Sequence, residues 1–353
     1  MSTKLKIVMT PGRLNRVDLY EAAGFEVVEG NMTTEDEMIE LMHDADAAQV
    51  GVLPLTTRRV LENCPKLKAV SRFGVGVDSI DLEAATELGV LVCNVPGSNT
   101  SEVADHAMAM LLAMTRCIVP ATNAVNAGAW QDNPRETGQY YFKVRRIAGQ
   151  TVGIIGFGDI GRAFASRVRG FGPKRIIAYD PYVSQLAGDL YGVEMVDLNE
   201  LVSQADFVTI HCSSTDETRH LINAETLSLM KPTALLINTA RGAIVSGDAL
   251  AEALQTGAIA GAALDVTETE PVPSDHPLLR MSNCIVTPHV AGFSSVFLAD
   301  CAQRQAENLI FALTGKAPHG LANPEVIKTI AVMRANNSGR WLGIPDFSTA
   351  LRL

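Results

Sequence analysis

The feature that most constrains this chain is a glycine-rich turn between a predicted strand and a predicted helix. An apolar, β-branched run, Thr151 to Ile155, predicts a buried strand, and a periodic helical segment begins within a few residues of its end. Between them, Gly156, Gly158 and Gly161 have the spacing G-x-G-x-x-G. In such a turn the first glycine permits the tight bend, the second admits a pyrophosphate close to the backbone, and the third lets the helix approach the strand. The anion then lies at the helix N-terminus, where free N–H groups and the helix dipole favour negative charge.

A second strand supports a dinucleotide-binding turn. The glycine spacing alone is weak evidence, because the chain has 28 glycines. The strand Arg175 to Tyr179 ends in Asp180, about 20 residues beyond the motif, where an acidic side chain accepts hydrogen bonds from an adenosine ribose. Asp180 would repel a 2′-phosphate, and Pro181-Tyr182-Val183 offers no arginine to receive one. We therefore expect the cofactor to be NAD rather than NADP.

Composition argues against several classes of partner. The 353 residues suffice for two domains, and the 47% hydrophobic content supports buried cores. A formal net charge of -10 argues against nucleic acid or an anionic membrane surface as the main partner. The longest helical apolar stretch, around residues 107–114, is shorter than the roughly 18 residues that a membrane span needs. The six cysteines form no C-x-x-C pair and no Cys/His cluster, which indicates neither disulfides nor a metal site, so we expect a cytoplasmic protein.

Short strands alternate with helical segments, which predicts an α/β fold with parallel sheets covered by helices on both faces. One strand is expected at residues 49–53 and a buried helix at 101–114. A final helix from 294 to 313 is expected to return to the first domain, making that domain discontinuous. We thus predict two doubly wound, Rossmann-like domains, with the NAD domain at residues 101–293 inserted into a discontinuous domain. The discontinuous domain consists of residues 1–100 and 294–323, and residues 324–353 form a tail without clear periodicity.

Two further segments leave alternatives open. The turn Gly74-Val75-Gly76 follows a predicted strand and lacks a third glycine, but its consecutive N–H groups can hold a small anion such as a carboxylate. A purely structural turn is the alternative. Residues 127–148, with Trp130 and Tyr140-Tyr141-Phe142, indicate an irregular excursion that is either a solvated loop or a dimer contact.

Three polar segments follow predicted strands: Asn238 to Gly242, Asp265 to Pro271 and Thr287 to Gly292. In an open parallel sheet, ligands bind beyond the carboxyl ends of the strands, so all three should border the NAD site. Reduction of a 2-keto acid by NADH requires the protein to hold a carboxylate, polarise a carbonyl and deliver one proton. Arg241 offers charge and forked donors for the first two tasks. His289 is the candidate proton donor, and Glu270 would favour its protonated form.

The chain resembles the D-2-hydroxyacid dehydrogenase family from about Lys4 to Asn323. The resemblance is carried by the glycine fingerprint and the three polar segments just described, together with Ser71 to Asp78, Asn94 to Thr100 and the pair Asp180-Pro181. It implies a catalytic set of Arg241, Glu270 and His289, with Arg241 also binding substrate and the backbone of Val75 and Gly76 binding the carboxylate. It implies NAD contacts at the fingerprint glycines and at six further positions: Gly156, Gly158, Gly161, Asp159, Ile160, Asp180, Cys212, Thr239 and Asp265. It also implies that the discontinuous domain binds substrate and that the NAD domain forms a homodimer.

The substrate stays open within the family. The segment Arg72 to Ala85 is similar to phosphoglycerate dehydrogenases, although the residues after 323 are too few for the regulatory domains that many of them append. The longer loop ending in residues 143–149 is similar to the C-terminal-binding-protein corepressors and their enzyme relatives. Hydroxypyruvate, glyoxylate, phosphoglycerate and a bulkier keto acid are all candidates, and an NAD-sensing interaction protein of corepressor type is the alternative function. Formate dehydrogenases are a third possibility, but they carry glutamine where this chain has Glu270.

Overall fold

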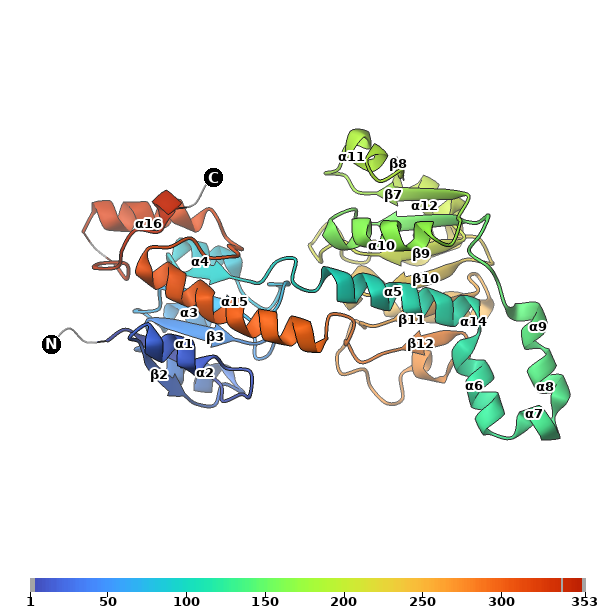
Figure 1. The fold of residues 1–353 in the computed structure, drawn as a ribbon, viewed down its shortest axis with the longest axis horizontal. Coiled ribbons are helices and arrows are strands. Elements are labelled where there is room, and N and C mark those ends of the chain that lie inside the picture. Colours follow the sequence, from blue (N-terminus) through green and yellow to red (C-terminus); the bar gives the residue numbers. More distant parts are fainter. Residues whose placement is uncertain (1–3, 338, 351–353) are drawn as a thin grey trace. The chain divides into compact units, whose positions relative to one another are not determined.

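The computed structural model describes residues 4–337 and 339–350. The chain divides into two compact units (Figure 1), an N-terminal unit formed by Met1–Asn99 with Ser294–Leu353 and a central unit formed by Thr100–Phe293. Each unit contains a parallel sheet with interleaved helices, which confirms the predicted fold class.

In the described residues of the N-terminal unit, the sheet has five strands in the order β2-β1-β3-β4-β5. They are β1 (Lys6–Met9), β2 (Glu26–Glu29), β3 (Ala47–Val50), β4 (Ala69–Arg72) and β5 (Leu91–Cys93). The helices of this unit are α1 (Val17–Ala22), α2 (Glu35–Met42), α3 (Arg58–Glu62), α4 (Leu82–Glu87), α15 (Ser295–Thr314) and α16 (Val326–Ala335), with the short η3 (Ser348–Ala350). The strand order reverses between β1 and β3, which is the switch point at which such sheets bind ligands.

The residues of β1 from Ile7 to Met9 are apolar on both faces of the sheet because each face is covered. Ile7 and Met9 of β1 join one core and Val8 joins the other, since successive side chains of a strand point to opposite sides. Leu309 and Leu313 of α15 belong to the first of these cores. Residues beyond 293 therefore complete the packing of a sheet built from the first 99 residues.

The central unit has seven strands within its described residues, in the order β12-β11-β10-β9-β6-β7-β8. They are β6 (Thr151–Ile155), β7 (Arg175–Tyr179), β8 (Glu194–Met195), β9 (Phe207–Ile210), β10 (Leu235–Asn238), β11 (Gly261–Leu264) and β12 (Cys284–Val286). The helices that flank them are α5 (Thr100–Thr115), α10 (Asp159–Arg169), α11 (Gln185–Asp189), α12 (Leu198–Gln204), α13 (Ala224–Leu229), α14 (Gly247–Thr256), η1 (Gly242–Ile244) and η2 (Pro277–Arg280). The order reverses between β6 and β9, so the fingerprint turn after β6 lies at the switch point.

Two buried clusters cover the two faces of this sheet. Ile154 packs with Phe164 of α10 and Leu111 of α5, whereas the next residue, Ile155, packs with Leu250 of α14 on the other side. Coverage on both faces explains why β6 reads as a continuous apolar run instead of an alternating one.

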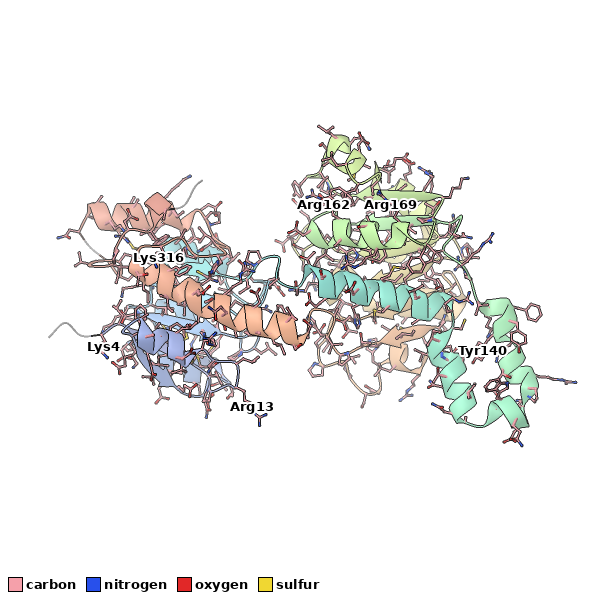
Figure 2. The ribbon with its side chains drawn as sticks, viewed as in Figure 1. Lys4, Arg13, Tyr140, Arg162, Arg169 and Lys316 are labelled. Atoms are coloured by element: carbon pink, nitrogen blue, oxygen red, sulfur yellow. The ribbon has the colours of Figure 1, made fainter. Side chains whose placement is uncertain are left out.

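The segment expected to be irregular is helical, which corrects that prediction. After α6 (Ile118–Asn126), the chain forms α7 (Ala129–Asp132), α8 (Pro134–Gly138) and α9 (Tyr140–Lys143). These helices have four or five residues, about one turn, which is too short to display a helical period in the sequence. Together α6–α9 extend away from the sheet as an arm (Figure 1), and Tyr140 marks α9 in Figure 2.

No single helix among the described residues has both the length and the apolar composition to cross a bilayer. The consecutive helices α5 and α6 meet those criteria only as a pair, and they are bent by 61° at their junction.

The segment expected to be a tail belongs to the N-terminal unit as far as the structure describes it; residues 338 and 351–353 lie outside the described residues. Its helix α16 packs against α4. Trp341 is fully buried, and its indole N–H donates to the Gly89 carbonyl at 2.7 Å. Phe347 joins the same core as α15. These residues are part of the packed unit.

Candidate active site

The glycine turn between β6 and α10 has the sterics that its spacing predicts. Gly156 has a φ of +88°, in the left-handed region that favours glycine, and a Cβ there would overlap the backbone of Cys212. A Cβ at Gly161 would overlap the Gly156 carbonyl, so the third glycine lets α10 pack against the turn. In contrast, a Cβ at Gly158 meets no atom of the described chain within 4 Å. The turn is therefore tight on its protein side and open at Gly158.

Asp180 and Cys212 flank this turn from the neighbouring strands β7 and β9. Asp180 accepts a hydrogen bond from the Phe157 N–H at 2.9 Å through one carboxylate oxygen and one from the Tyr182 N–H at 3.0 Å through the other. The carboxylate therefore fixes the fingerprint turn relative to its own loop. Burial raises the pKa of the Cys212 thiol to about 11, so this thiol is uncharged at neutral pH.

The central unit has polar groups that a bound dinucleotide would satisfy. Asp159 and Ile160 open α10, and no side chain of the described residues caps that helix at Gly158. Their N–H groups and the helix dipole suit a phosphate. Thr239, directly after β10, has a buried hydroxyl without a hydrogen-bond partner in the described part of the chain. Since buried polar groups are nearly always paired, this orphaned hydroxyl and the open turn at Gly158 fit NAD.

The register of three adjacent strands brings the other candidate residues to one edge of the central sheet. Asn238 of β10 pairs with Leu264 of β11, which pairs with Val286 of β12. The loops that leave these strands therefore start at the same level. They carry Arg241, Glu270 and His289 respectively.

Arg241 is held by its own loop and by a glycine next to it. The buried Asn238 side chain donates to the Arg241 carbonyl at 2.9 Å and accepts from the Ala240 N–H at 3.0 Å. The Arg241 guanidinium donates to the Ala240 carbonyl at 2.8 Å. A Cβ at Gly242 would overlap the carbonyl of Thr267, so only glycine lets the Arg241 loop touch the loop that carries Glu270.

Glu270 and His289 form a direct pair. Nδ1 of His289 lies 2.6 Å from Oε2 of Glu270, and Oε1 of Glu270 accepts from the Thr267 N–H at 3.1 Å. The two side chains are 43% and 37% exposed for His289 and Glu270, so the pair is open to a ligand. With Nδ1 engaged by the carboxylate, Nε2 is the nitrogen left to exchange a proton.

Electrostatics keep Glu270 ionised. Burial by itself raises the pKa of this carboxyl group, but the hydrogen bond and charge of His289, the Thr267 N–H and the charge of Arg241 outweigh it, so its pKa is lowered overall. The charge of Arg241 also acts on Glu270, in the same direction as that of His289.

Asp265, expected as a nucleotide contact, also anchors the His289 segment. Its fully buried carboxylate accepts from Thr287 Oγ1 at 2.5 Å, from the Val290 N–H at 3.0 Å and from the Ala291 N–H at 2.8 Å. The Asp265 carbonyl accepts from the His289 N–H at 2.8 Å. His289 itself has a φ of +52°, a conformation that these flanking bonds hold in place.

The sequence interpretation missed His106 and Glu268. His106, on α5, lies 3.2 Å from Thr287 Oγ1 and 3.6 Å from Asp265 through Nε2. The available signal was a histidine directly before the apolar run 107–114 of this helix. Glu268 lies two residues before Glu270 and pairs with His220 at 2.5 Å.

Val75 and Gly76 belong to the N-terminal unit, in the loop after β4 at the carboxyl edge of its sheet. The Asn94 side chain donates to the Val75 carbonyl at 2.7 Å, and the Val95 N–H donates to the Gly74 carbonyl at 2.9 Å. These contacts hold the turn by its carbonyl groups.

No group of three or more His, Cys, Asp or Glu side chains that could hold a metal ion is present in residues 4–337 and 339–350.

Comparisons with known proteins place this geometry in context. Residues 108–291 match the family model for the NAD-binding domain of D-isomer-specific 2-hydroxyacid dehydrogenases. The chain is 40% identical over 290 residues to a glyoxylate reductase of Thermococcus litoralis, covering 82% of this chain and 87% of that protein. It is also 40% identical over 321 residues to a D-3-phosphoglycerate dehydrogenase of Methanocaldococcus jannaschii, covering 90% of this chain but only 59% of that protein. The chain is also similar to a solved structure, that of an NADPH-dependent glyoxylate/hydroxypyruvate reductase of Sinorhizobium meliloti in complex with NADP and malonate. The two structures match with a TM-score of 0.78 and 31% sequence identity, and the match covers 91% of this chain and 98% of that one.

Proposed function

The chain belongs to the D-isomer-specific 2-hydroxyacid dehydrogenase family, and we propose that it interconverts a small 2-hydroxy acid and its 2-keto acid with NAD, using Arg241, Glu270 and His289. The observation that carries the proposal is the 2.6 Å contact between His289 Nδ1 and Glu270 Oε2. An imidazole backed by a carboxylate can give and take the one proton that this reaction needs at the substrate oxygen.

The residues of this chain divide the chemistry among them. Bound NADH supplies the hydride. Arg241 binds the substrate carboxylate and polarises the keto group through its fork of donors. Glu270 accepts the Nδ1 hydrogen of His289, which fixes the ring and leaves Nε2 to pass its proton to the substrate oxygen. The N–H groups of Val75 and Gly76 are proposed as a second contact to the carboxylate, by family resemblance.

We propose NAD rather than NADP as the cofactor because Asp180 presents a carboxylate beside the fingerprint turn. The carboxylate suits ribose hydroxyls and would repel a 2′-phosphate. The choice of cofactor is argued from Asp180 of this chain and not from similar proteins, because one of them is described as NADPH-dependent.

Replacing His289 by alanine tests the proposed function. We expect turnover to fall by about two to four orders of magnitude, the usual contribution of a positioned general acid. NADH binding, measured by calorimetric titration, should persist because the fingerprint turn is untouched. Retained turnover in the variant would remove His289 from this role. Tight NAD binding by the unmodified protein, without NADH oxidation on a panel of 2-keto acids, would favour the interaction-protein alternative.

Exposed apolar residues favour a substrate with an uncharged side chain. Val52, Leu53 and Leu55 follow β3 and are 50%, 70% and 48% exposed. Their loop lies beside the Gly74 turn, because the Phe73 N–H donates to the Val50 carbonyl and Ser79 Oγ donates to the Gly51 carbonyl. Arg72, a candidate for a phosphate, donates to the Phe73 carbonyl at 2.5 Å. These features favour glyoxylate, hydroxypyruvate or an apolar keto acid over phosphoglycerate.

We also propose a homodimer formed through the arm of the central unit, and a cytoplasmic location. Trp130, Tyr141 and Phe142 of the arm are 70%, 79% and 93% exposed, and such large aromatic side chains are typical of protein interfaces. All six cysteines are unpaired, which is consistent with a reducing compartment.

A further inference from the structure

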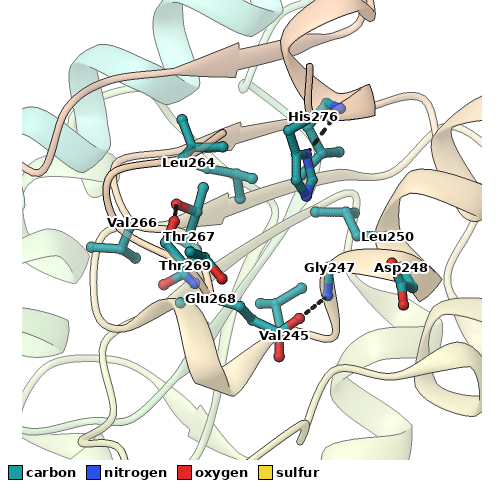
Figure 3. A pocket seen from close by; sticks show the side chains of 14 residues that line it. Val245, Gly247, Asp248, Leu250, Leu264, Val266, Thr267, Glu268, Thr269 and His276 are labelled. Atoms are coloured by element: carbon teal, nitrogen blue, oxygen red, sulfur yellow. Dashed lines mark hydrogen bonds between the residues drawn. The ribbon is translucent and has the colours of Figure 1, made fainter. Parts of the chain in front are cut away.

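The turn that carries Glu270 borders a cavity of about 180 Å³ in the central unit (Figure 3). Thr267, Glu268 and Thr269 form one side of this cavity. The rest of the lining consists chiefly of apolar side chains and the start of α14: Val245, Leu250, Leu264, Leu278 and Gly247. Because close packing normally fixes side chains, a turn beside an open cavity needs other contacts to hold its shape.

Glu268 provides such contacts. Its Oε2 accepts from the Gly247 N–H at 2.6 Å, at the first residue of α14 (Figure 3), and its Oε1 lies 2.5 Å from Nε2 of His220. The carboxylate thus links the turn to the start of α14 and to His220. An acidic side chain is also favoured at a helix N-terminus.

The turn transmits this anchoring to Glu270 over a short path. The Thr267 hydroxyl donates to the Thr269 carbonyl at 2.8 Å, and the Thr267 N–H donates to the Glu270 carboxylate at 3.1 Å. The far oxygen of Glu270 meets His289. A shift of Glu268 therefore moves the group that orients the proposed proton donor.

We propose that Glu268 and His220 are a positioning pair that holds the turn 267–270, so that Glu270 faces His289 across the correct distance. This inference rests on the proposed function. Neither residue touches the reacting atoms, and both act through Glu270.

The charges around Glu268 favour its ionised form. Burial by itself raises the pKa of Glu268, but the Gly247 N–H, the hydrogen bond and charge of His220 and the charge of Arg219 lower it overall. Asp248 and His276 line the same cavity. Of these groups, His220 and the Gly247 N–H make hydrogen bonds with the carboxylate.

The experiment compares Glu268→Ala, His220→Ala and Glu268→Gln in the full chain. Loss of an anchor allows a displacement of about 1 Å, which can cost on the order of 100-fold in kcat, so we expect a 10- to 100-fold loss in both alanine variants. KM for NADH should stay unchanged. Glu268→Gln keeps an oxygen to accept from the Gly247 N–H and should restore most of the activity. Asp248→Asn, in the same cavity, is the matched control and should behave as the unmodified protein.

Two readouts separate positioning from general stability. Glu270→Gln removes the negative charge next to the His289 ring, so the alkaline limb of its pH–rate profile should move to lower pH. The limb should move in the same direction in the two alanine variants. The ¹⁵N signals of the His289 ring, which report its tautomer and its hydrogen bond, should move toward those of Glu270→Gln. Unmoved ring signals and an unmoved limb in folded Glu268→Ala and His220→Ala would overturn the proposal, even if the melting temperature fell.

The ring signals also separate a failure of the positioning role from a failure of the proposed function. If the unmodified protein oxidises NADH with none of the keto acids, the proposed function fails. The ring signals then still decide whether Glu268 and His220 control the pair. If Glu268→Ala does not fold, His220→Ala carries the same test.

Discussion

Asp265 is expected to hold the His289 segment in place without any coenzyme. Its buried carboxylate accepts hydrogen bonds from Thr287, Val290 and Ala291. Asp265→Asn keeps one acceptor oxygen but turns its amide NH₂ toward a backbone N–H, which is then buried and unsatisfied. Such a group costs about 1–3 kcal/mol, so we expect the free energy of unfolding of the coenzyme-free protein to fall by that amount. Asp265→Ala removes every acceptor and should cost about 3–5 kcal/mol, as when one partner of a buried charged network is lost.

The measurement is urea unfolding of the coenzyme-free protein followed by circular dichroism. Asp275→Asn is the control, because this exposed residue lies in the segment between β11 and β12 and surface changes stay within about 0.5 kcal/mol. Both Asp265 variants should also lose turnover, since His289 shares the anchored segment. An Asp265→Asn variant with unchanged stability and weakened NADH binding would refute this reasoning, because the carboxylate would then serve only the coenzyme.

Three further outcomes are expected. Asp180→Asn keeps an oxygen for the Phe157 N–H but loses the charge, so calorimetric titration should show about tenfold weaker NADH binding. The preference for NADH over NADPH should fall as well, and an unchanged ratio of the two dissociation constants would contradict the role of Asp180. Leu53→Arg should raise kcat/KM for a phosphorylated 2-keto acid relative to glyoxylate, and equal ratios before and after would separate Leu53 from the substrate. Trp130→Ala combined with Phe142→Ala should convert a dimer into a monomer in light scattering, and a dimer that survives both changes would place the interface elsewhere.

Features set by local sterics could be predicted from the sequence. The roles of Gly156 and Gly161 follow from backbone geometry, which the spacing alone encodes. That the loops carrying Arg241, Glu270 and His289 leave the sheet at a common edge could also be anticipated, because the three parallel strands are in register.

Other features depend on contacts between distant residues or on segments too short to have a period. The Asp265 carboxylate bonds to residues more than 20 positions away, and Trp341 enters a core formed by the first strands of the chain. The helices α7–α9 are about one turn each. The strand expected at 49–53 is β3 (Ala47–Val50), because the apolar residues that follow Val50 are exposed beyond the carboxyl end of the strand and not packed in the sheet. Hydrophobicity indicated a strand where the molecule has a candidate specificity loop.

The two tryptophans give each unit its own spectroscopic reporter. Trp341 is fully buried in the N-terminal unit, whereas Trp130 is 70% exposed in the central unit. Indole emission shifts to the red as its surroundings become more polar, so a single chain contains one blue-emitting and one red-emitting fluorophore, and burial of Trp130 in the proposed dimer would move the second toward the blue. Single Trp→Phe variants would let the melting of the two units be followed one at a time in the same chain.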